Sequence, residues 1–480
     1  MEELISYSKA FSRNIGYVFH SGSIRLTALT GTAATEIKGD TTAREFRLMT
    51  KGNYTATPEE IHDFMDTRMA VVDEISFADH DSVLGKMSEN IRMFTQDFSR
   101  PYGSLPMAFL GDFCQLECIG NNTIFSHPRS VYWEQALTAM VELKGTHRYS
   151  KCGTLTKIMP GLRDIGMTEE TRKLFNSRVV DGVNVILPNI TKAKFATFHN
   201  KNRCEYNQSV FLSYLKEHHT GCNEYNIPKS AVVIKASTSW TRSKQQLSFG
   251  QRKVIFENCT DNDVKDPNSS KHCDPMLTLF TGCQVMGTSN DDVRNGIANG
   301  TTSVLKKVIF KKGKKPTPMK LHGYWVYSIN AEDVEHVVLE WHESRFKGRF
   351  IIKPKSQGYQ VAFPIVQDGQ KMRVKTGITL FQLPILINHA TTGHKLQGKT
   401  LDDLIVAEWS KLKNWAYVVL SRVRTLAGLF LLKPIPIDID FAPDPRYIEM
   451  MTRLRSKILC TSTDSCVSEL HSSFTFPEST

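Results

Sequence analysis

The sequence has few cysteines and does not arrange them as metal ligands or as a disulfide framework. Ten cysteines are scattered over 480 residues, and no two of them form a C-x-x-C pair. This spacing excludes a zinc ribbon and a small disulfide scaffold, and it is typical of a reduced, intracellular protein.

Long apolar runs are also missing. No stretch approaches the roughly 18 apolar residues that a membrane-spanning helix needs. The N-terminal string MEELISYSKAF is acidic and then amphipathic, unlike a signal peptide or an obvious transit peptide. We therefore expect no membrane partner.

A third absence concerns nucleotide chemistry. The sequence contains no G-x-x-x-x-G-K-[ST], the loop whose backbone amides cradle the phosphates of ATP. Strings that resemble the other parts of such a site are present, as described below.

The composition itself is that of a globular protein with ample core. Hydrophobic residues make up 40% and charged residues 23% of a chain long enough for two to four domains. The formal net charge is +11 and the pI is about 9.0. A basic balance suits a polyanion partner, although charge is a solubility property first.

The first part of the chain alternates between apolar strands and amphipathic helices. The patterns predict helices at 2–12 and 82–94 and strands at 24–29, 69–72 and 105–110. Near-continuous apolar strands that alternate with helices predict an α/β fold with a parallel sheet covered on both faces. A further helix is predicted at 131–138.

The rest of the chain predicts a second α/β domain with an insertion. A strand at 193–198 and a helix at 203–215 open this domain, and a long polar loop follows at 240–275. Short strands from about 276 to 380 predict a small inserted β-barrel. No element is predicted beyond Pro434, and 461–480 is Ser/Thr-rich and expected to be disordered. The predicted segments are 1–150, 151–275, 276–380, 381–440 and 441–480.

Acidic residues follow two of the apolar strands. In AVVDEIS, Asp73 and Glu74 follow an apolar run, and in LPMAFLGDFCQL, Asp112 and Gln115 follow a second apolar run. An Asp at a strand end can hold Mg²⁺, a neighbouring Glu can polarise a water, and a Gln can hydrogen-bond a terminal phosphate. For DEIS alone, two solvated acids are the alternative. The spacing of about 40 residues fits one βαβ unit and favours a common site.

Basic residues offer further candidates. Arg148 in THRYS and Arg422 in LSRVR could face a γ-phosphate, where one arginine can contribute about 10³–10⁵ in rate. The alternative for Arg148 is a surface residue. HKLQGKT at 394–400 suits a phosphate backbone or is a basic turn. The basic run at 305–315 is more typical of a solvated hairpin, and a DNA-binding patch is the alternative.

Together these strings resemble the Pif family of DNA helicases, in superfamily 1B. LTALTGTAATEI, VVDEIS and LGDFCQLECIG resemble motifs Ia, II and III, and LKGTHRYS resembles the Arg-bearing motif that follows. FATFHNKNRCEYN and GCQVMGTSNDDVRNGIANGT resemble the opening of the second motor domain and of its insertion. LPILINHATTGHKLQGKTLDDL and YVVLSRVRTLAGLFLLKP resemble motifs V and VI. The resemblance covers about 26–434.

The resemblance implies two RecA-like motor domains that hydrolyse ATP and move 5′ to 3′ on single-stranded DNA. Asp73 would hold Mg²⁺, Glu74 would be the catalytic base, and Gln115 would sense the γ-phosphate. Arg148 and Arg422 would be arginine fingers. Asp112 would also line the nucleotide site, and the residues expected to contact DNA are Thr30, Gly31, His394, Lys395 and Thr400.

The family also implies partners and cellular roles. Single-stranded DNA and duplex junctions are the expected partners of a monomer in the nucleus or mitochondrion. DNA repair, recombination and telomere maintenance are the expected roles.

The missing phosphate loop is the main departure from the family. The pattern places that loop and its strand just before the helix ELISY, so we expect an N-terminally incomplete copy of a longer protein. We also expect it to fold poorly, because a central strand would be missing, and to be inactive as an ATPase without the upstream sequence. An ATPase-defective nucleic-acid-binding remnant and a decayed mobile-element gene remain alternatives.

Overall fold

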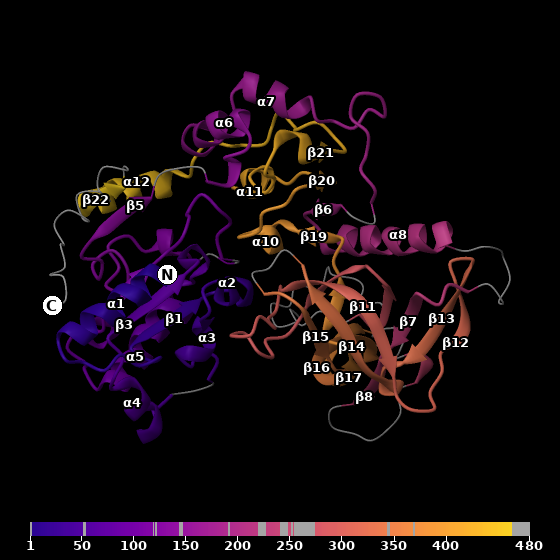
Figure 1. The fold of residues 1–480 in the computed structure, drawn as a ribbon, viewed down its shortest axis with the longest axis horizontal. Helices are drawn as coiled ribbons and strands as arrows, with labels where there is room; N and C mark the ends of the chain where they lie inside the picture. Colours follow the sequence, from indigo (N-terminus) through magenta and orange to yellow (C-terminus); the bar gives the residue numbers. More distant parts are fainter. Residues whose placement is uncertain are drawn as a thin grey trace, which may run out of the picture. The chain divides into compact units, whose positions relative to one another are not determined.

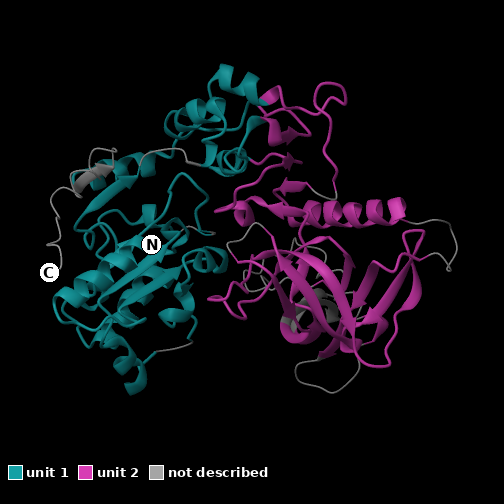
Figure 2. Cartoon of the chain, in the orientation of Figure 1, with its two compact units in different colours: residues 1–175, 411–426, 437–480 teal, residues 176–410, 427–436 magenta. Residues whose placement is uncertain are grey.

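The chain forms two compact units. The computed structural model describes residues 2–50, 54–118, 120, 122–143, 147–190, 193–218, 227–240, 248–250, 253, 274–342, 346–367 and 370–462. Unit 1 comprises 1–175, 411–426 and 437–480, and unit 2 comprises 176–410 and 427–436 (Figure 2). The predicted segment boundaries at 150, 275, 380 and 440 do not coincide with this division, and they stay predictions.

Unit 1 is built on a four-stranded parallel sheet (Figure 1). Its strands, in spatial order, are β2 (Asp40–Thr41), β1 (Ile24–Ala28), β3 (Met69–Asp73) and β4 (Met107–Phe109). Ala70, Val71 and Val72 have no exposed surface. Because successive side chains of a strand point to opposite faces, the sheet is covered on both faces, as the apolar run predicts.

Helices of unit 1 form where apolar residues recur every three or four positions. Met87, Ile91 and Phe94 put one face of α5 into the core. A capping box between Thr57 and Glu60 starts α4. The α-helices are α1 (Glu2–Asn14), α2 (Gly31–Glu36), α3 (Thr42–Glu45), α4 (Pro58–Phe64), α5 (Lys86–Thr95), α6 (Gly153–Asp164), α7 (Glu169–Asn176), α11 (Trp415–Leu420) and α12 (Pro445–Arg455).

Two predictions for unit 1 were wrong. Residues 131–136 form turns and 137–138 are irregular, rather than a helix. The backbone N–H groups of Trp133 and Gln135 both donate hydrogen bonds to the carbonyl of Ser130. Beyond Pro434 the chain is ordered further than the pattern indicates, because α12 and β22 (Ile458–Ser462) follow. The expected disorder at 463–480 lies outside the described residues.

The segment after Pro434 is fixed by packing and by ion pairs. Met450, Met451 and Leu454 of α12 are buried in the core of unit 1. Strand β22 pairs in parallel with β5 (Met140–Leu143). The guanidinium of Arg453 donates two hydrogen bonds, of 2.7 and 2.8 Å, to the buried carboxylate of Glu134. This bidentate pair anchors α12 in unit 1.

Unit 2 contains a second parallel sheet. Its strands, in spatial order, are β19 (Ala390–Thr392), β6 (Lys194–Thr197), β20 (Leu404–Val406) and β21 (Leu429–Leu431). Helix α8 (Asn200–His218) buries Val210, Phe211 and Leu215 against the core, and the short α10 (Gly393–Leu396) follows β19 directly. The predicted parallel α/β architecture is therefore confirmed.

The rest of unit 2 is rich in antiparallel strands. One sheet has the order β15 (Arg349–Ile352), β14 (Val334–Trp341), β11 (Thr302–Phe310), β10 (Gln284–Gly287), β18 (Ile385–Ile387). A second has β12 (Thr317–Leu321), β13 (Tyr324–Asn330), β7 (Ala231–Lys235), β9 (Met276–Phe280), and a third has β16 (Lys355–Gln367), β17 (Gln370–Gln382), β8 (Ser237–Trp240). Within the second sheet the β13–β7 pair is parallel.

These sheets contain the strands predicted for the inserted barrel, but they do not show a barrel confined to the predicted range. The strands expected between 276 and 380 are present, but they pair with β7 and β8 before this range and with β18 after it. Closure into a barrel stays a prediction. Most of the polar loop predicted at 240–275 lies outside the described residues. Among the described helices, none has the length and apolar character needed to cross a membrane.

Candidate functional site

The two acidic motifs lie at neighbouring strand ends of unit 1. Asp73 is the last residue of β3, and Asp112 follows β4 by three residues. Strands β3 and β4 are parallel neighbours, so their carboxyl ends meet at the same edge of the sheet. In open α/β sheets ligands bind at this edge. The structure thus brings together the two motifs that the sequence separates by about 40 residues.

Glu74 has an unusual backbone and a perturbed side chain. Its φ of 59° is left-handed, a conformation that costs a non-glycine residue about 1–3 kcal/mol and is enriched at functional sites. Burial, then the nearby carboxylates of Asp73 and Asp112, raise the pKa of Glu74 to about 7, while Arg422 acts in the opposite direction. A carboxyl group with this pKa can take up or release a proton near neutral pH.

Asp73 is held beside Glu74 by a short local contact. Its Oδ1 accepts a 2.8 Å hydrogen bond from the backbone N–H of Glu74. Burial raises the pKa of Asp73, and this hydrogen bond opposes the change. The Asp73 carboxylate is a suitable oxygen ligand for Mg²⁺.

Gln115 is tied to Asp112 and to the segment that begins α11. Its Nε2 donates a 3.3 Å hydrogen bond to Oδ2 of Asp112, whose Oδ1 accepts from the backbone N–H of Cys114 at 2.9 Å. The backbone carbonyl of Gln115 accepts a 2.9 Å hydrogen bond from Nδ2 of Asn414. The side-chain amide of Gln115 is therefore held by Asp112, and its backbone is held by Asn414.

The two candidate arginine fingers converge on one serine. Nη1 of Arg148 and the hydroxyl of Tyr149 each donate a 3.0 Å hydrogen bond to the carbonyl of Ser421. Nε of Arg422 donates to the carbonyl of Val418 at 2.8 Å, and Nε and Nη2 donate to the Ser421 hydroxyl at 3.1 and 2.5 Å. Arg422 is 1% exposed, and burial, then the charge of Arg148, lower its pKa to about 10.

Three buried polar atoms of these residues have no hydrogen-bond partner within the described part of the chain. They are Oε2 of Glu74, Oε1 of Gln115 and Nη1 of Arg422. Leaving a buried polar atom unpaired costs on the order of 1–3 kcal/mol, so such a group of atoms is typical of a ligand site. Carboxylates, an amide and guanidinium groups are the groups that a Mg²⁺–phosphate ligand and its attacking water require.

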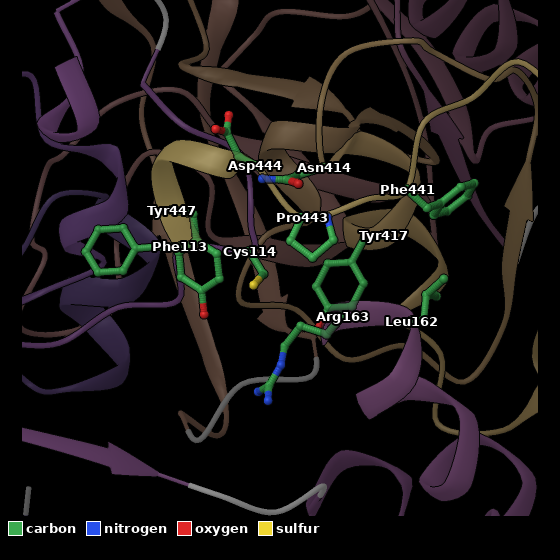
Figure 3. Close-up of a pocket in the computed structure, with 10 residues that line it drawn as sticks. All are labelled: Phe113, Cys114, Leu162, Arg163, Asn414, Tyr417, Phe441, Pro443, Asp444 and Tyr447. Carbon is green, nitrogen blue, oxygen red and sulfur yellow. The ribbon is translucent and has the colours of Figure 1, made fainter. Parts of the chain in front are cut away.

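A small pocket of unit 1 adjoins this site (Figure 3). Cys114, Asn414 and Tyr417 line it, together with the aromatic rings of Phe441 and Tyr447. Burial, then the nearby charge of Asp112, raises the pKa of the Cys114 thiol to about 12, so this thiol stays protonated and unreactive.

The residues expected to contact DNA are divided between the two units. In unit 1, the hydroxyl of Thr30 caps α2 by accepting from the backbone N–H of Ala33 at 3.2 Å, and Gly31 is buried. In unit 2, Nζ of Lys395 donates to Oδ1 of Asn299 at 3.0 Å. His394 and Thr400 are half-buried. Burial lowers the pKa values of both His394 and Lys395.

Local sequence does not single out Ser421 or Asn414 as residues of the site. Ser421 precedes Arg422 in LSRVR, and the only available signal was its position in that string. Asn414 begins α11 with a left-handed φ of 65°, a conformation that asparagine tolerates better than most residues. Neither the side-chain contact of Asn414 nor the convergence on Ser421 has a signature in local sequence.

Comparisons with known proteins agree with the motif series. No model of a known protein family matches the sequence. An ATP-dependent DNA helicase Pif1 from Bdellovibrio bacteriovorus is 23% identical over 86% of this chain and 80% of that protein. ATP-dependent DNA helicases PIF1 of Danio rerio and Candida albicans are 24% and 20% identical over 88% and 76% of this chain. The chain spans about half the length of these two relatives, 55% and 43%.

Solved structures show the same fold. Bacteroides Pif1 bound to single-stranded DNA matches with a TM-score of 0.61 at 16% identity, over 94% of this chain and 91% of that one. Pif1 helicase from Candida albicans matches with a TM-score of 0.60 at 20% identity, over 94% and 92%. The matches confirm, in sequence and in fold, the resemblance to the Pif family that the motif series predicts.

Proposed function

We propose that this chain is the motor part of an ATP-dependent DNA helicase of the Pif type. The observation that carries the proposal is the group formed in unit 1 by Glu74, Gln115 and Arg422, each with a buried atom that has no partner within the described residues. The names of the relatives support the same reaction class, and one matched structure is Pif1 helicase from Bacteroides in complex with ADP-AlF3 and single-stranded DNA.

The proposed roles follow from the chemistry of each side chain. Magnesium ATP, when bound, supplies the phosphoanhydride bond and a cation that neutralises its charge. Asp73 offers a carboxylate to the cation, and Glu74 accepts a proton from the attacking water. Gln115 donates an amide hydrogen bond to the terminal phosphate. Arg148 and Arg422 stabilise the charge that develops as the bond breaks.

The phosphate-cradling loop is not among the 480 residues. The chain therefore supplies the hydrolytic groups of the proposed site and none of the usual G-x-x-x-x-G-K-[ST] contacts to the β- and γ-phosphates. A nucleic-acid-binding protein without ATPase activity is the second candidate function, and this absence is the observation that favours it.

The finer expectations are part of the same proposal. Movement is 5′ to 3′ on single-stranded DNA, duplex junctions are substrates, and the working form is a monomer. DNA repair, recombination or telomere maintenance in the nucleus or mitochondrion is the proposed setting. DNA contacts at Thr30, Gly31, His394, Lys395 and Thr400 are proposed from the motifs, although Lys395 would first have to leave its hydrogen bond with Asn299.

One comparison of variants separates the two candidates. ATP hydrolysis with single-stranded DNA, and DNA binding, are measured for the chain and for its Glu74→Gln variant. A helicase motor loses turnover in Glu74→Gln and keeps DNA binding. The matched control is Glu59→Gln on the exposed side of α4, which leaves both activities unchanged. The deciding measurement uses a form of the chain that carries a phosphate loop upstream of Met1, because the 480 residues have none. DNA binding without any DNA-stimulated hydrolysis by that form overturns the helicase proposal in favour of the second candidate.

A further inference from the structure

A second group of polar side chains in unit 1 lies outside the proposed nucleotide site. His80, Asp81 and His127 each offer one metal-ligating atom, and these atoms all lie within 4.8 Å of one another. His80 is buried, His127 is half-buried, and Asp81 is exposed. None of the three belongs to a motif that the resemblance assigns a role. We propose that these three residues bind a transition-metal ion of the Zn²⁺ type.

The hydrogen bonds select which ring nitrogens would bind the ion. Nε2 of His80 lies 2.6 Å from the hydroxyl of Ser130, and Nε2 of His127 lies 2.5 Å from Oδ1 of Asn122. In metal sites a ligating histidine commonly donates its other ring N–H to an oxygen, which fixes the tautomer and turns the second nitrogen towards the metal. Each Nε2 atom has an oxygen partner outside the group of three. Nδ1 of His80 instead faces Oδ1 of Asp81, another proposed ligand, so the Nδ1 atoms are assigned as the ligands and an ion would replace that contact.

The third ligand is a carboxylate held in place by its neighbours. Oδ1 of Asp81 lies 2.7 Å from Nδ1 of His80, and Oδ2 of Asp81 accepts a 3.0 Å hydrogen bond from Nδ2 of Asn122. The same amide donates to Oδ1 of Asp79 at 3.1 Å. Asn122 thus orients both Asp81 and His127, which is the role of an outer residue in a metal site.

The charge of the group also suits a cation. The carboxylates of Asp79 and Asp81 flank His80 in the sequence, and both accept hydrogen bonds from Nδ2 of Asn122. Two carboxylates therefore stand beside the two imidazoles. Two imidazole nitrogens and one carboxylate are ligands of Zn²⁺, Co²⁺ or Ni²⁺, whereas Mg²⁺ prefers oxygen ligands alone.

The local backbone supports a built site. His80 and Asp81 begin a π-helix, His80–Gly85, in place of the regular start predicted at Ser82. Such helices are rare and are frequent at functional sites. Asp79 caps this π-helix by accepting from the backbone N–H groups of Asp81 and Ser82. The same Oδ1 of Asp79 also accepts from Nδ2 of Asn122, so the backbone at Asp81 and the Asn122 side chain share one acceptor.

Metal binding requires one movement. The rings of His80 and His127 stack with their centroids 3.9 Å apart and their planes at 14°. The lone pairs of stacked rings lie in parallel planes, so they meet at one ion only after a ring tilts. His127 follows the short helix Ile124–Ser126 and is half-buried, so it is the ring that turns.

The test is a titration of the full chain, freed of metal by a chelator, with Zn²⁺ and separately with Co²⁺. Calorimetry should show one Zn²⁺ per chain, and the visible spectrum of Co²⁺ should show a low-symmetry site. Affinity should fall at least tenfold in His127→Ala and Asp81→Asn, and about 10–100-fold in Asn122→Ala, which removes only the orienting amide. Mg²⁺ should not compete.

Two controls keep the result specific. His62→Ala, at an exposed position of α4, should bind Zn²⁺ like the unaltered chain, which excludes general histidine binding. Glu74→Gln should also bind normally, so the result is independent of the proposed ATP site. Equal affinity in the unaltered chain, His127→Ala and Asp81→Asn would overturn the proposal, as would the lack of any Zn²⁺ binding by the unaltered chain. Asp81→Asn keeps the shape of the side chain and removes its charge. It therefore tests the site even if His127→Ala fails to fold.

Discussion

At the scale of single residues, Glu74 gives the clearest prediction of how the stability of the fold depends on pH. Its pKa in the folded protein is about 7, against an ordinary value of 4.5. The folded state therefore holds this proton more tightly than the unfolded state. The stability that the proton contributes is complete below pH 4.5 and is lost as the pH rises through about 7.

Replacement of Glu74 by Gln should remove this pH dependence. Glutamine stays neutral, so at pH 8 the variant should be more stable than the unaltered chain by about 1–3 kcal/mol, since one pKa unit corresponds to about 1.4 kcal/mol. Near pH 4.5 the two proteins should differ little. Urea unfolding at both pH values measures this, with Glu59→Gln as the control. A difference that does not change with pH would contradict the assignment of the raised pKa to Glu74.

A substitution at Ser421 can separate the contribution of the Arg422 contact from that of the Arg148 contact. Ser421→Ala removes the hydroxyl that accepts from Arg422 and keeps the backbone carbonyl that accepts from Arg148. Loss of a hydrogen bond to a charged group should lower the unfolding free energy by about 1.5–3 kcal/mol and should reduce ATP hydrolysis.

Threonine supplies the control for that experiment. Ser421→Thr restores the hydroxyl, so it should recover both stability and hydrolysis. If Ser421→Thr is as defective as Ser421→Ala, then the packing of this buried position rather than its hydroxyl is what matters.

At the scale of elements, α12 shows why burial cannot be read from a short pattern. Met450 has no exposed surface, while Ile448 two positions earlier is 50% exposed. Met450→Ala should lower the unfolding free energy by about 2–5 kcal/mol, because it leaves a cavity in the core of unit 1. Ile448→Ala, on the same helix, should change it by less than about 1 kcal/mol. Equal effects in urea unfolding would mean that α12 does not pack as described.

The elements that the sequence predicted well are those with strong periodicity. The strand predicted at 69–72 is present, and most of the helix predicted at 82–94 is present as α5 from Lys86 onward, because a continuous apolar run or a three-to-four-residue repeat leaves few alternatives. The helix predicted at 131–138 was wrong, since turn hydrogen bonds to Ser130 replace the helical ladder there. The start of the helix after DEIS was also missed, because a π-helix forms first.

At the scale of the whole molecule, the net charge of +11 predicts that DNA binding depends on salt concentration. Binding to single-stranded DNA should weaken linearly in a plot of log K against log salt, with a slope of about 0.7 for each phosphate neutralised. The basic hairpin after β11 is predicted not to contribute. Its Lys314 forms a 2.8 Å ion pair with Asp333, and Lys306 of β11 pairs with Glu340.

Replacement of two exposed lysines of the hairpin tests this. Lys312→Ala combined with Lys315→Ala should leave the salt slope of DNA binding unchanged, as measured by fluorescence anisotropy between low and physiological salt. A decrease of about 1.4 in the slope would instead place both lysines on the DNA backbone.

Sequence alone determined the parallel α/β class and the identity of the chemical groups. An apolar run that leads to Asp73 or Asp112 specifies a strand followed by a polar end, because both properties are local. Only the tertiary structure determines which side chains are in contact. Ser421 lies 273 residues from Arg148, and Ser130 lies 50 residues from His80, so no local pattern encodes either contact. The raised pKa of Glu74 likewise depends on folding, because burial and the approach of the Asp112 carboxylate, 38 residues away in the sequence, arise only in the folded sheet.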